Sequence, residues 1–344
     1  MDAMPRVSII ILNWNGWKDT IECLESVYQI TYPNYDVIVV DNGSENESVE
    51  KIKEYAEGRL HVESRFFEYT AENKPLKYIE YSLEEAEADE GTEKVVTHLP
   101  PSEKLILIKN GKNFGFAEGN NIGIRYAFKT FNPEYVLLLN NDTVVDNNFL
   151  TELVKITVSD DMIGFAGPKN YYYDYHGRTD VINFAGGKIT MWMGKSEHIG
   201  LREIDEGQYD RITNTDYVTG ACLLARREVL DAIGLLDPVY FLYWEETDWC
   251  IRAKNVGYKL IYVPSAKIWH KVAASQEGGT NKYFYIRNSF MFVKKNATQV
   301  QYAAYLLYFF GLKLWQLSGI SIIYKRNIKE GISIVKGAIE GIKV

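Results

Sequence analysis

The sequence predicts an α/β fold with a mostly parallel central sheet, and the order of its apolar segments carries this prediction. Residues 7–12 and 36–40 read as strands buried on both faces, because each is a continuous apolar run rich in Val and Ile. A helix is expected between them, from about residue 17 to residue 29. Residues 105–109 and 135–139 supply further strands of the same kind. A buried strand, a helix and a second buried strand in succession are typical of a parallel sheet.

The composition favours a single large soluble enzyme over a nucleic-acid-binding protein. The chain has 344 residues, of which 46% are hydrophobic, so it can bury a full α/β core. Its formal net charge of -8 would repel the phosphates of a nucleic acid. The three cysteines, Cys23, Cys222 and Cys250, are scattered and indicate neither a disulfide framework nor a zinc site. The apolar run at 7–12 is too short for a signal peptide, so we expect a cytoplasmic protein.

Polar or aromatic side chains follow the first two predicted strands, at the edge where ligands of open α/β sheets collect. The second strand ends at Asp41, which suits a hydrogen-bond acceptor for a nucleoside. Trp14 follows the first strand and could stack on a base. Each residue has an equally good structural interpretation, Asp41 as a helix cap and Trp14 as part of the core.

The strand at 135–139 ends in Asn140, Asn141 and Asp142. Two amides and a carboxylate at the carboxyl end of a strand suit a hard divalent cation, which takes oxygen ligands and usually arrives with a substrate's phosphates. The alternative is a simple polar turn, because Asn and Asp side chains hydrogen-bond their own backbone.

A glycine-rich block follows the strand at 105–109. Gly115, Gly119 and Gly123 would let backbone amides approach a diphosphate closely. The block is neither a dinucleotide-binding fingerprint nor a P-loop, because the spacing of its glycines fits neither pattern.

Acidic side chains gather after residue 244. Glu245 and Glu246 follow Trp244 at the start of a predicted helix, and a partly desolvated carboxylate there has the raised proton affinity of a general base. His270, further along the chain, could complete a metal shell. The alternatives are an acidic first helical turn that the helix dipole favours, which would include Asp248, and a core histidine.

In this order the segments resemble glycosyltransferase family 2, the inverting nucleotide-sugar transferases of GT-A fold, and most closely its rhamnosyltransferase-like branch. The resemblance covers roughly residues 6–296. It implies a Rossmann-like, mostly parallel central sheet flanked by helices. We expect one catalytic domain over residues 1–300, with an acidic insertion at about 60–103.

The resemblance also implies a role for each motif. Leu12, Trp14 and Asp41 would hold the nucleobase and ribose, and Asp142 and His270 would bind Mn²⁺ or Mg²⁺. The rest of the implied donor-binding set is Asn113, Gly115, Phe116, Asn120, Asn140 and Asn141.

Glu246 falls on the family's base position, with Glu245 and Asp248 as neighbours that could take that role. The chain departs from the family pattern twice. Asn140 replaces the first acid of the metal motif, and Glu246 replaces the usual Asp.

The expected activity is therefore inverting transfer of a sugar from a nucleotide-diphosphate donor to a hydroxyl of a cell-envelope polysaccharide or lipid-linked glycan. The branch suggests dTDP-rhamnose as the first donor and a UDP-sugar as the next. One alternative is an inactive scaffold that binds a glycan or nucleotide sugar, although such a protein would lose the base or metal residues that are present here. The other is a nucleotidyltransferase, whose usual glycine-rich start is missing after residue 12.

Residues 301–344 predict an amphipathic helical tail. The segment 302–324 is apolar and aromatic, and Lys325, Arg326, Lys329 and Lys336 follow it. Lys313 near its middle would cost roughly 2.5 to 3.5 kcal/mol inside a bilayer, so a helix lying in the membrane interface fits better than a span. Packing against the catalytic domain, or against a second copy in a homodimer, is an equal alternative. We expect the protein at the cytosolic face of a membrane.

Two further segments have simpler interpretations. Residues 69–101 are rich in Glu and indicate a solvated insertion, which includes Asp89 and Glu90. Residues 180–201 predict a hairpin on the acceptor side, with Gly186 and Gly187 between its β-prone runs.

Overall fold

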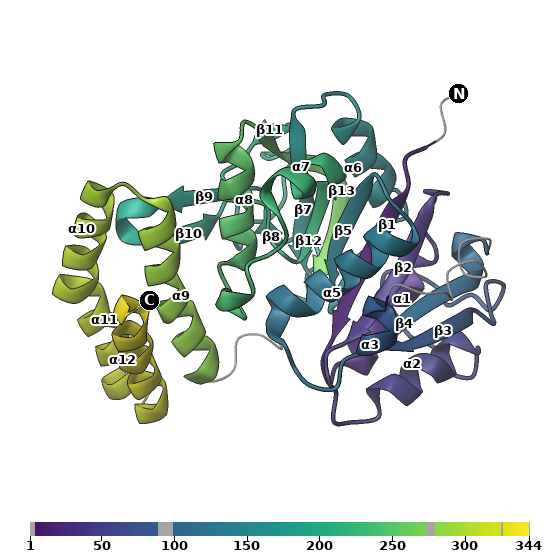
Figure 1. The fold of residues 1–344 in the computed structure, drawn as a ribbon, viewed down its shortest axis with the longest axis horizontal. Coiled ribbons are helices and arrows are strands. Elements are labelled where there is room, and N and C mark those ends of the chain that lie inside the picture. Colours follow the sequence, from purple (N-terminus) through teal and green to yellow (C-terminus); the bar gives the residue numbers. More distant parts are fainter. Residues whose placement is uncertain (1–3, 89–98, 273–278, 325, 344) are drawn as a thin grey trace.

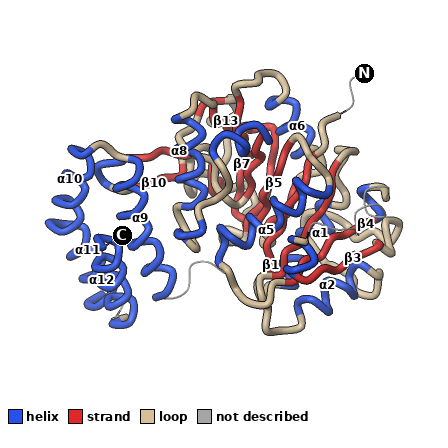
Figure 2. The backbone as a smooth tube through the Cα atoms, viewed as in Figure 1, coloured by secondary structure: helices blue, strands red, loops and turns tan. Residues whose placement is uncertain are grey.

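A computed structural model of the chain describes residues 4–88, 99–272, 279–324 and 326–343. A long twisted sheet runs through the molecule with helices on both faces, and a separate group of helices lies at the C-terminal end (Figure 1). Strands occupy the middle of the body and helices its surface (Figure 2). The predicted α/β architecture with a mostly parallel central sheet is confirmed.

The N-terminal half supplies the parallel part of the sheet, in the order β5-β1-β2-β4-β3. Its strands are β1 (Val7–Asn13), β2 (Tyr35–Asp41), β3 (Lys77–Ser82), β4 (Lys104–Lys109) and β5 (Tyr135–Asn140). Its helices are α1 (Trp17–Val27), α2 (Ser48–Ala56), α3 (Leu83–Glu87) and α5 (Gly115–Thr130), with the 3-10 turn η1 (Pro101–Glu103). Asn13 pairs with Asp41, and Leu12 pairs with Asn140. The carboxyl ends of three strands therefore meet at one edge.

The second half continues the sheet with mixed directions. β12 lies antiparallel between β5 and β7, while β13 lies parallel to β7. Its strands are β6 (Thr143–Val145), β7 (Ile163–Tyr172), β8 (Ile182–Phe184), β11 (Thr213–Asn214), β12 (Cys222–Arg226) and β13 (Lys259–His270). Its helices are α6 (Phe149–Thr157), α7 (Arg227–Ile233) and α8 (Glu245–Asn255), with the 3-10 turn η3 (Pro238–Tyr240). β6 pairs with the last residues of β13, which sets Thr143 opposite His270.

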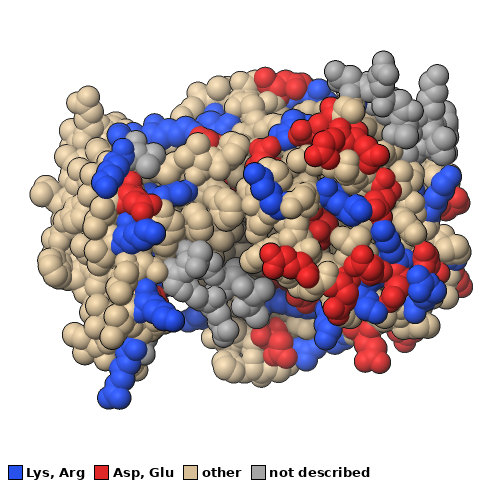
Figure 3. Space-filling view, turned by 60° about the horizontal axis from the view of Figure 1, so that its bottom comes forward, with Lys and Arg blue, Asp and Glu red and all other residues tan. Residues whose placement is uncertain are grey.

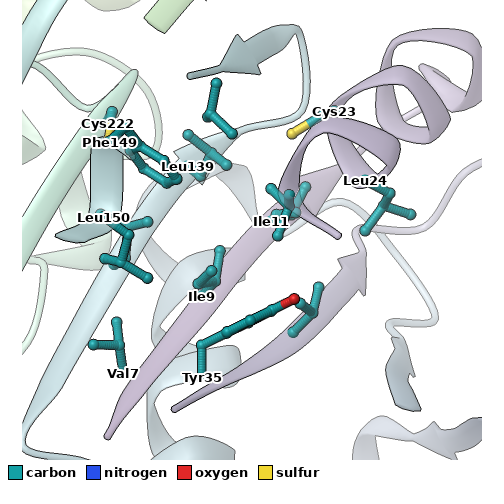
Figure 4. Packing of buried hydrophobic residues seen from close by; sticks show 14 of the residues in the cluster. Val7, Ile9, Ile11, Cys23, Leu24, Tyr35, Leu139, Phe149, Leu150 and Cys222 are labelled. Carbon is teal, nitrogen blue, oxygen red and sulfur yellow. The ribbon is translucent and has the colours of Figure 1, made fainter. Parts of the chain in front are cut away.

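Apolar side chains on both faces of the sheet form the core. Ile9 and Ile11 point to the face covered by α1, where Leu24 packs against them (Figure 4). Ile10 points to the opposite face, which α5 covers. This alternation follows from the period of two along a strand, and it explains why the first strand is apolar throughout.

The predicted hairpin is present, but its turn lies elsewhere. β9 (Gly187–Thr190) pairs with β10 (Lys195–His198), and the turn η2 (Met191–Met193) joins them. The expected turn at Gly186 and Gly187 is therefore wrong, since Gly186 lies between β8 and β9 and Gly187 is the first residue of β9.

Residues of the predicted insertion contribute to the edge of the sheet. β3 pairs with β4 as the last strand in the order, and Ala86 of α3 is buried against the body. Asp89 and Glu90 lie outside the described residues.

The C-terminal helices form their own packing cluster. They are α9 (Gly279–Asn296), α10 (Gln299–Tyr308), η4 (Phe309–Lys313), α11 (Leu314–Gly319), η5 (Ile320–Tyr324) and α12 (Ile328–Lys343). Phe290 and Tyr305 pack there against Tyr240 and Trp244 of the body. In the described part of the chain, one continuous helix, 299–324, is long and apolar enough to cross a membrane, with a mean hydropathy of 1.4, and 11% of its apolar window is buried.

Candidate active site

Asp142 and His270 lie side by side at the carboxyl edge of the sheet. The pairing of β6 with β13 brings them together, and the Lys271 amide donates to the Asp142 carbonyl at 3.0 Å. His270 Nε2 lies 3.1 Å from Asp142 Oδ1, and the two side chains are 12% and 13% exposed. Burial raises the pKa of Asp142, but the charge interactions with His270 and Lys271 outweigh burial, so the pKa lies below its usual value.

Nδ1 of His270 has no hydrogen-bond partner among the described residues, and Nε2 faces Asp142 Oδ1 without the geometry of a hydrogen bond. A buried ring nitrogen without a partner is costly, and metal ligation is one way of satisfying it. The described part of the chain contains no group of three or more His, Cys, Asp or Glu side chains able to hold a metal ion. Two protein ligands fit a cation that is completed by substrate phosphates, which is the usual arrangement for Mg²⁺ at phosphate sites.

Charged side chains from α1 flank this pair. Lys271 Nζ lies 2.5 Å from Asp19 Oδ1 and 2.6 Å from Glu22 Oε2, and the Tyr173 hydroxyl donates to Glu22 at 2.8 Å. Burial lowers the pKa of Lys271, but the bonds to Asp19 and Glu22 outweigh it and the net pKa is raised. The sequence offered no signal for this cluster, because its members come from three separate segments.

The carboxylate oxygens of Asp41 accept hydrogen bonds from its own turn and from Asn13. Its Oδ1 accepts from Asn13 Nδ2 and from Ser44 Oγ, both at 2.6 Å, and its Oδ2 accepts from the Ser44 amide at 3.1 Å. Asp41 therefore caps this turn and not a helix, because the next helix, α2, begins at Ser48 after Glu47. The helix-cap interpretation is wrong. Trp14, by contrast, is 56% exposed, so the core interpretation of Trp14 is wrong and its ring is accessible for stacking.

The two asparagines before Asp142 differ in their contacts. Asn141 Nδ2 donates to Thr20 Oγ1 at 3.0 Å, which ties the turn to α1. Asn140 ends β5, where its amide donates to the Ala221 carbonyl at 3.0 Å.

The glycine-rich block opens α5, and its first amides have protein partners. Phe116 N and Ala117 N donate to the Phe241 carbonyl at 2.6 and 3.4 Å. The expectation that amides of this block approach a diphosphate is therefore wrong for these two. Gly115 has a φ of +81°, and a Cβ there would lie 2.5 Å from atoms of Phe241. Only glycine allows this contact.

The other glycines of the block serve packing. A Cβ at Gly119 would meet Leu12 at 2.6 Å, and a Cβ at Gly123 would meet Ile10 at 2.6 Å. These glycines let α5 lie close against β1. Asn120 Nδ2 donates to the Phe116 carbonyl at 2.8 Å, within the same helix.

Asn42, which the sequence analysis missed, connects this block to the end of β2. Its amide donates to Asn113 Oδ1 and to the Gly115 carbonyl, both at 3.0 Å, and its Oδ1 accepts from the Phe114 amide at 3.1 Å. Asn113 Oδ1 also accepts from the Gly115 amide at 2.8 Å. A buried Asn in a turn sequence has no local signature, because only the fold reveals its partners.

The three acids of α8 lie in different surroundings. Glu245 is buried, Glu246 is half-buried, and burial raises the pKa of both, with the charge of Glu246 adding to the effect on Glu245. Glu246 Oε1 accepts from Thr247 Oγ1 at 3.2 Å. Asp248 is fully buried, and its two oxygens accept from four side chains: Tyr240, Arg252, Lys295 and Asn296.

Glu246 lies at the same edge as Asp142. A Cβ at Gly220 would be 3.7 Å from Glu246 Cγ and 3.3 Å from Phe116 Cζ. Ala221, the next residue, accepts the Asn140 amide. The structure thus brings the base position, the glycine-rich block and the end of β5 together. Burial and the Glu246 charge raise the pKa of Tyr217 and Tyr285.

Comparisons with known proteins agree with this arrangement. Residues 83–289 match the family described as glycosyltransferase like family 2, and residues 8–70 match glycosyl transferase family 2. A low-salt glycan biosynthesis hexosyltransferase of Haloferax volcanii is 25% identical over 69% of this chain and 75% of its own length. The dTDP-rhamnosyl transferase RfbF of Shigella flexneri is 25% identical over 56% of this chain and 64% of its own length.

Solved structures share the fold. A mannosyltransferase from Pyrobaculum calidifontis, in complex with GDP-Man and Mn²⁺, superposes with a TM-score of 0.56 at 14% identity, over 99% of this chain and 88% of its own. Such low identity shows a common GT-A architecture and no more. The family match covers most of the sheet edge described above, from the glycine-rich block to the acidic helix. The chain therefore belongs to glycosyltransferase family 2 and is a rhamnosyltransferase-like member of it.

Proposed function

We propose that this glycosyltransferase is metal-dependent and inverting, and that it moves a sugar from a nucleotide-diphosphate donor to a hydroxyl of a cell-envelope polysaccharide or lipid-linked glycan. The observation that carries the proposal is the buried imidazole of His270, which faces Asp142 and has no hydrogen-bond partner for Nδ1 among the described residues, at the sheet edge that also presents Glu246. Ligands of α/β sheets bind at this edge.

Asp142 and His270 would hold Mn²⁺ or Mg²⁺. The bound cation would supply Lewis-acid stabilisation of the charge that builds on the departing nucleoside diphosphate. The structure of the Pyrobaculum calidifontis mannosyltransferase with GDP-Man and Mn²⁺ supports the choice of ligand class. Lys271 lies beside the pair, but Asp19 and Glu22 already engage its ammonium group.

Glu246 is the proposed general base. It would accept the proton of the acceptor hydroxyl as that oxygen attacks the anomeric carbon from the face opposite the leaving group, so one displacement inverts the configuration. Its raised pKa suits a base that works near neutral pH. Asp248 fits this role poorly, because four donors already occupy its oxygens. Glu245 fits poorly as well, because it is 4% exposed.

Trp14 is the proposed stacking surface for the nucleobase, since its ring is exposed at the end of β1. Leu12, Asp41 and Asn140 would line the nucleoside and phosphate side, with Asp41 acting through the turn that it holds together. We propose dTDP-rhamnose as the first donor to test, supported by the similarity to the Shigella flexneri dTDP-rhamnosyl transferase, and a UDP-sugar as the second.

Thermal unfolding with a panel of nucleotide sugars, with and without Mn²⁺, tests the donor proposal. A donor at about 100 times its dissociation constant should add about 2.7 kcal/mol of stability. We expect this increase in unfolding temperature to require the cation and to be absent from the Asp142→Asn variant. A panel that gives no cation-dependent shift in the wild-type protein contradicts the proposal.

The C-terminal helices are proposed to contact a membrane surface. Trp315, Ile323 and Tyr324 on the apolar helix are 71%, 79% and 87% exposed. In α12, five exposed apolar residues recur every three or four positions and lie on one face: Ile328, Ile332, Val335, Ile339 and Ile342.

Charge favours a membrane as the partner of this face. Lys329, Lys336 and Lys343 recur every seventh residue along one side of the apolar stripe in α12. The end of the molecule formed by these helices is largely uncharged in Figure 3, with Lys and Arg side chains along its margin. Apolar residues bordered by lysines are typical of a helix that lies on an anionic membrane. Such contact would place the enzyme where a lipid-linked acceptor is held.

Liposome co-sedimentation tests this surface. Replacing Ile332 and Ile339 together by Ser should weaken binding to anionic vesicles about tenfold or more, because each buried apolar side chain contributes about 1.5 to 3 kcal/mol. Turnover of a soluble acceptor analogue should be unchanged. Val256→Ser, an equally exposed apolar site at the end of α8, is the control. Unchanged liposome binding together with loss of a dimer would identify the face as a subunit interface instead.

A further inference from the structure

The loop 241–244 adopts a backbone conformation that its residues rarely take. Phe241, Tyr243 and Trp244 have φ values of 65°, 69° and 76°. Such angles cost of order 1–3 kcal/mol at each non-glycine residue and persist only where the surroundings enforce them. The loop leads directly into α8, whose second residue is Glu246. Its conformation therefore sets the direction in which the base position points.

The side chain of Asn288, in α9, hydrogen-bonds to this loop. It is fully buried, and its Nδ2 lies 2.7, 2.8 and 2.9 Å from the carbonyl oxygens of Tyr240, Leu242 and Tyr243. Its Oδ1 accepts from Arg287 Nε at 2.8 Å, which fixes the orientation of the amide. One side chain thus engages three carbonyls along the strained segment.

The same loop also contacts the donor side of the site. The Phe241 carbonyl is the acceptor for the first amides of α5, Phe116 N and Ala117 N. The Trp244 indole donates to the Tyr285 carbonyl at 3.1 Å, next to the arginine that orients Asn288. Helices α5, α8 and α9 are therefore joined through four consecutive residues.

We propose that Asn288 is a positioning residue for the transfer step, which acts by holding the loop 241–244 so that Glu246 and the first turn of α5 keep their relative placement. The inference rests on the proposed role of Glu246 as base. Without the Asn288 amide, the Leu242 and Tyr243 carbonyls lose the bond from Asn288, and the positive φ values lose this support. The Tyr240 carbonyl keeps the Leu242 amide and Arg287 as donors. A misplacement of about 1 Å at a reacting group can cost about 10²-fold in rate.

Asn288→Ala in the full-length enzyme tests the proposal. We expect kcat to fall about 10- to 100-fold while the KM for the donor changes less than about threefold, because the donor contacts Glu246 only through the acceptor. The acidic limb of the kcat–pH profile should also move, since the surroundings of Glu246 change.

Ser289→Ala is the matched control. Ser289 is the next residue of α9 and is also buried, but its hydroxyl donates to the Ile286 carbonyl at 2.7 Å and lies 2.8 Å from the Tyr305 hydroxyl, away from the loop. This variant should lose thermal stability and keep its kcat and pH profile. If Asn288→Ala does not fold, Asn288→Ser, whose hydroxyl is a shorter donor, replaces it. This variant should also lose kcat, but by a smaller factor.

Wild-type kcat in Asn288→Ala or Asn288→Ser would overturn the positioning role, and so would an equal kcat loss in Ser289→Ala. Glu246→Gln measured alongside separates this failure from that of the proposed function. An inactive Glu246→Gln with a fully active Asn288→Ala refutes the positioning role alone. A fully active Glu246→Gln refutes the base assignment itself.

Discussion

Two buried acids in the first turn of α8, Glu245 and Asp248, differ in whether their carboxyl oxygens have hydrogen-bond partners. Asp248 is fully buried, and Arg252, Lys295 and two neutral donors satisfy its oxygens. Glu245, three residues earlier, is also buried, but its Oε2 has no hydrogen-bond partner in the part of the chain that the structure describes. The donors that satisfy Asp248 include Lys295 and Asn296 of α9, whereas Oε2 of Glu245, at the first residue of α8, has no such donor among the described residues. Unsatisfied acids with raised pKa values are the ones to expect at a reactive site.

The largest loss of turnover is expected at Asp142 and His270, the proposed metal ligands. Asp142→Asn and His270→Ala should each abolish metal-stimulated turnover, a loss of about 10³-fold or more, because a Lewis acid supplies several kcal/mol of transition-state stabilisation. Circular dichroism should show an intact fold, since either change affects the contact between His270 Nε2 and Asp142 Oδ1 but leaves the backbone pairing of β6 with β13 in place. A variant with wild-type activity and metal response removes its residue from the proposed shell.

Glu246→Gln should produce the next largest loss. Glutamine keeps the size and the bond from Thr247 but cannot accept a proton, so transfer should fall about 10² to 10⁴-fold while donor and metal affinity survive. Single-turnover transfer and nucleotide-sugar binding measure the two quantities separately. Near-normal transfer by this variant would exclude Glu246 as the base.

Asp248→Asn should have the opposite effect to Glu246→Gln, lowering stability and leaving catalysis largely unchanged. The change removes the charge that pairs with Arg252 and Lys295, so the free energy of unfolding should fall by about 1 to 3 kcal/mol while kcat stays within a few-fold. Urea unfolding and steady-state kinetics check both. If kcat instead drops about 10²-fold with no loss of stability, the base assignment moves to Asp248.

Glu245→Gln should have the smallest effect, and the size of its effect on stability depends on pH. Burial raises the pKa of Glu245 in the folded state, so the folded protein binds more protons than the unfolded chain above the ordinary pKa. The wild-type protein therefore loses stability as pH rises above about 4.5 toward the folded-state pKa. The variant should gain melting temperature by a few degrees at pH 8 and less at pH 4. A gain that is equal at both pH values would show that Glu245 is not buried as a charge-sensitive group.

The features that the sequence predicted well are those with a local signature. The strands at Val7 and Tyr35 could be predicted from continuous apolar runs. The placement of Asp41 at the end of β2 and of Asp142 just after the end of β5 followed from such runs. The adjacency of Asp142 and His270 has no such signature, because it depends on β6 pairing with the far end of β13. Only the family resemblance indicated it.

The wrong predictions have a common cause. Glycines can serve a ligand or a packing contact, and Gly115 and Gly119 proved to face Phe241 and Leu12. Gly186 can make a turn, but the hairpin turn formed where Tyr305 packs on Gly194. In each case a residue distant in sequence determined which contact the glycine makes. The role proposed for Asn288 could not be predicted from the sequence for the same reason, because the carbonyls it contacts lie more than 40 residues away along the chain.

The pairing of β6 with β13 has a consequence for biosynthesis. Asp142 and His270 come from distant parts of the chain, and neither alone offers a shell that could retain Mn²⁺ or Mg²⁺. If these two residues hold the proposed cation, a chain still emerging from the ribosome would lack the complete pair of ligands until β13 is synthesised and docked. Metal uptake by this enzyme would report the completion of its sheet, and the cation could stabilise the finished protein without guiding its early folding.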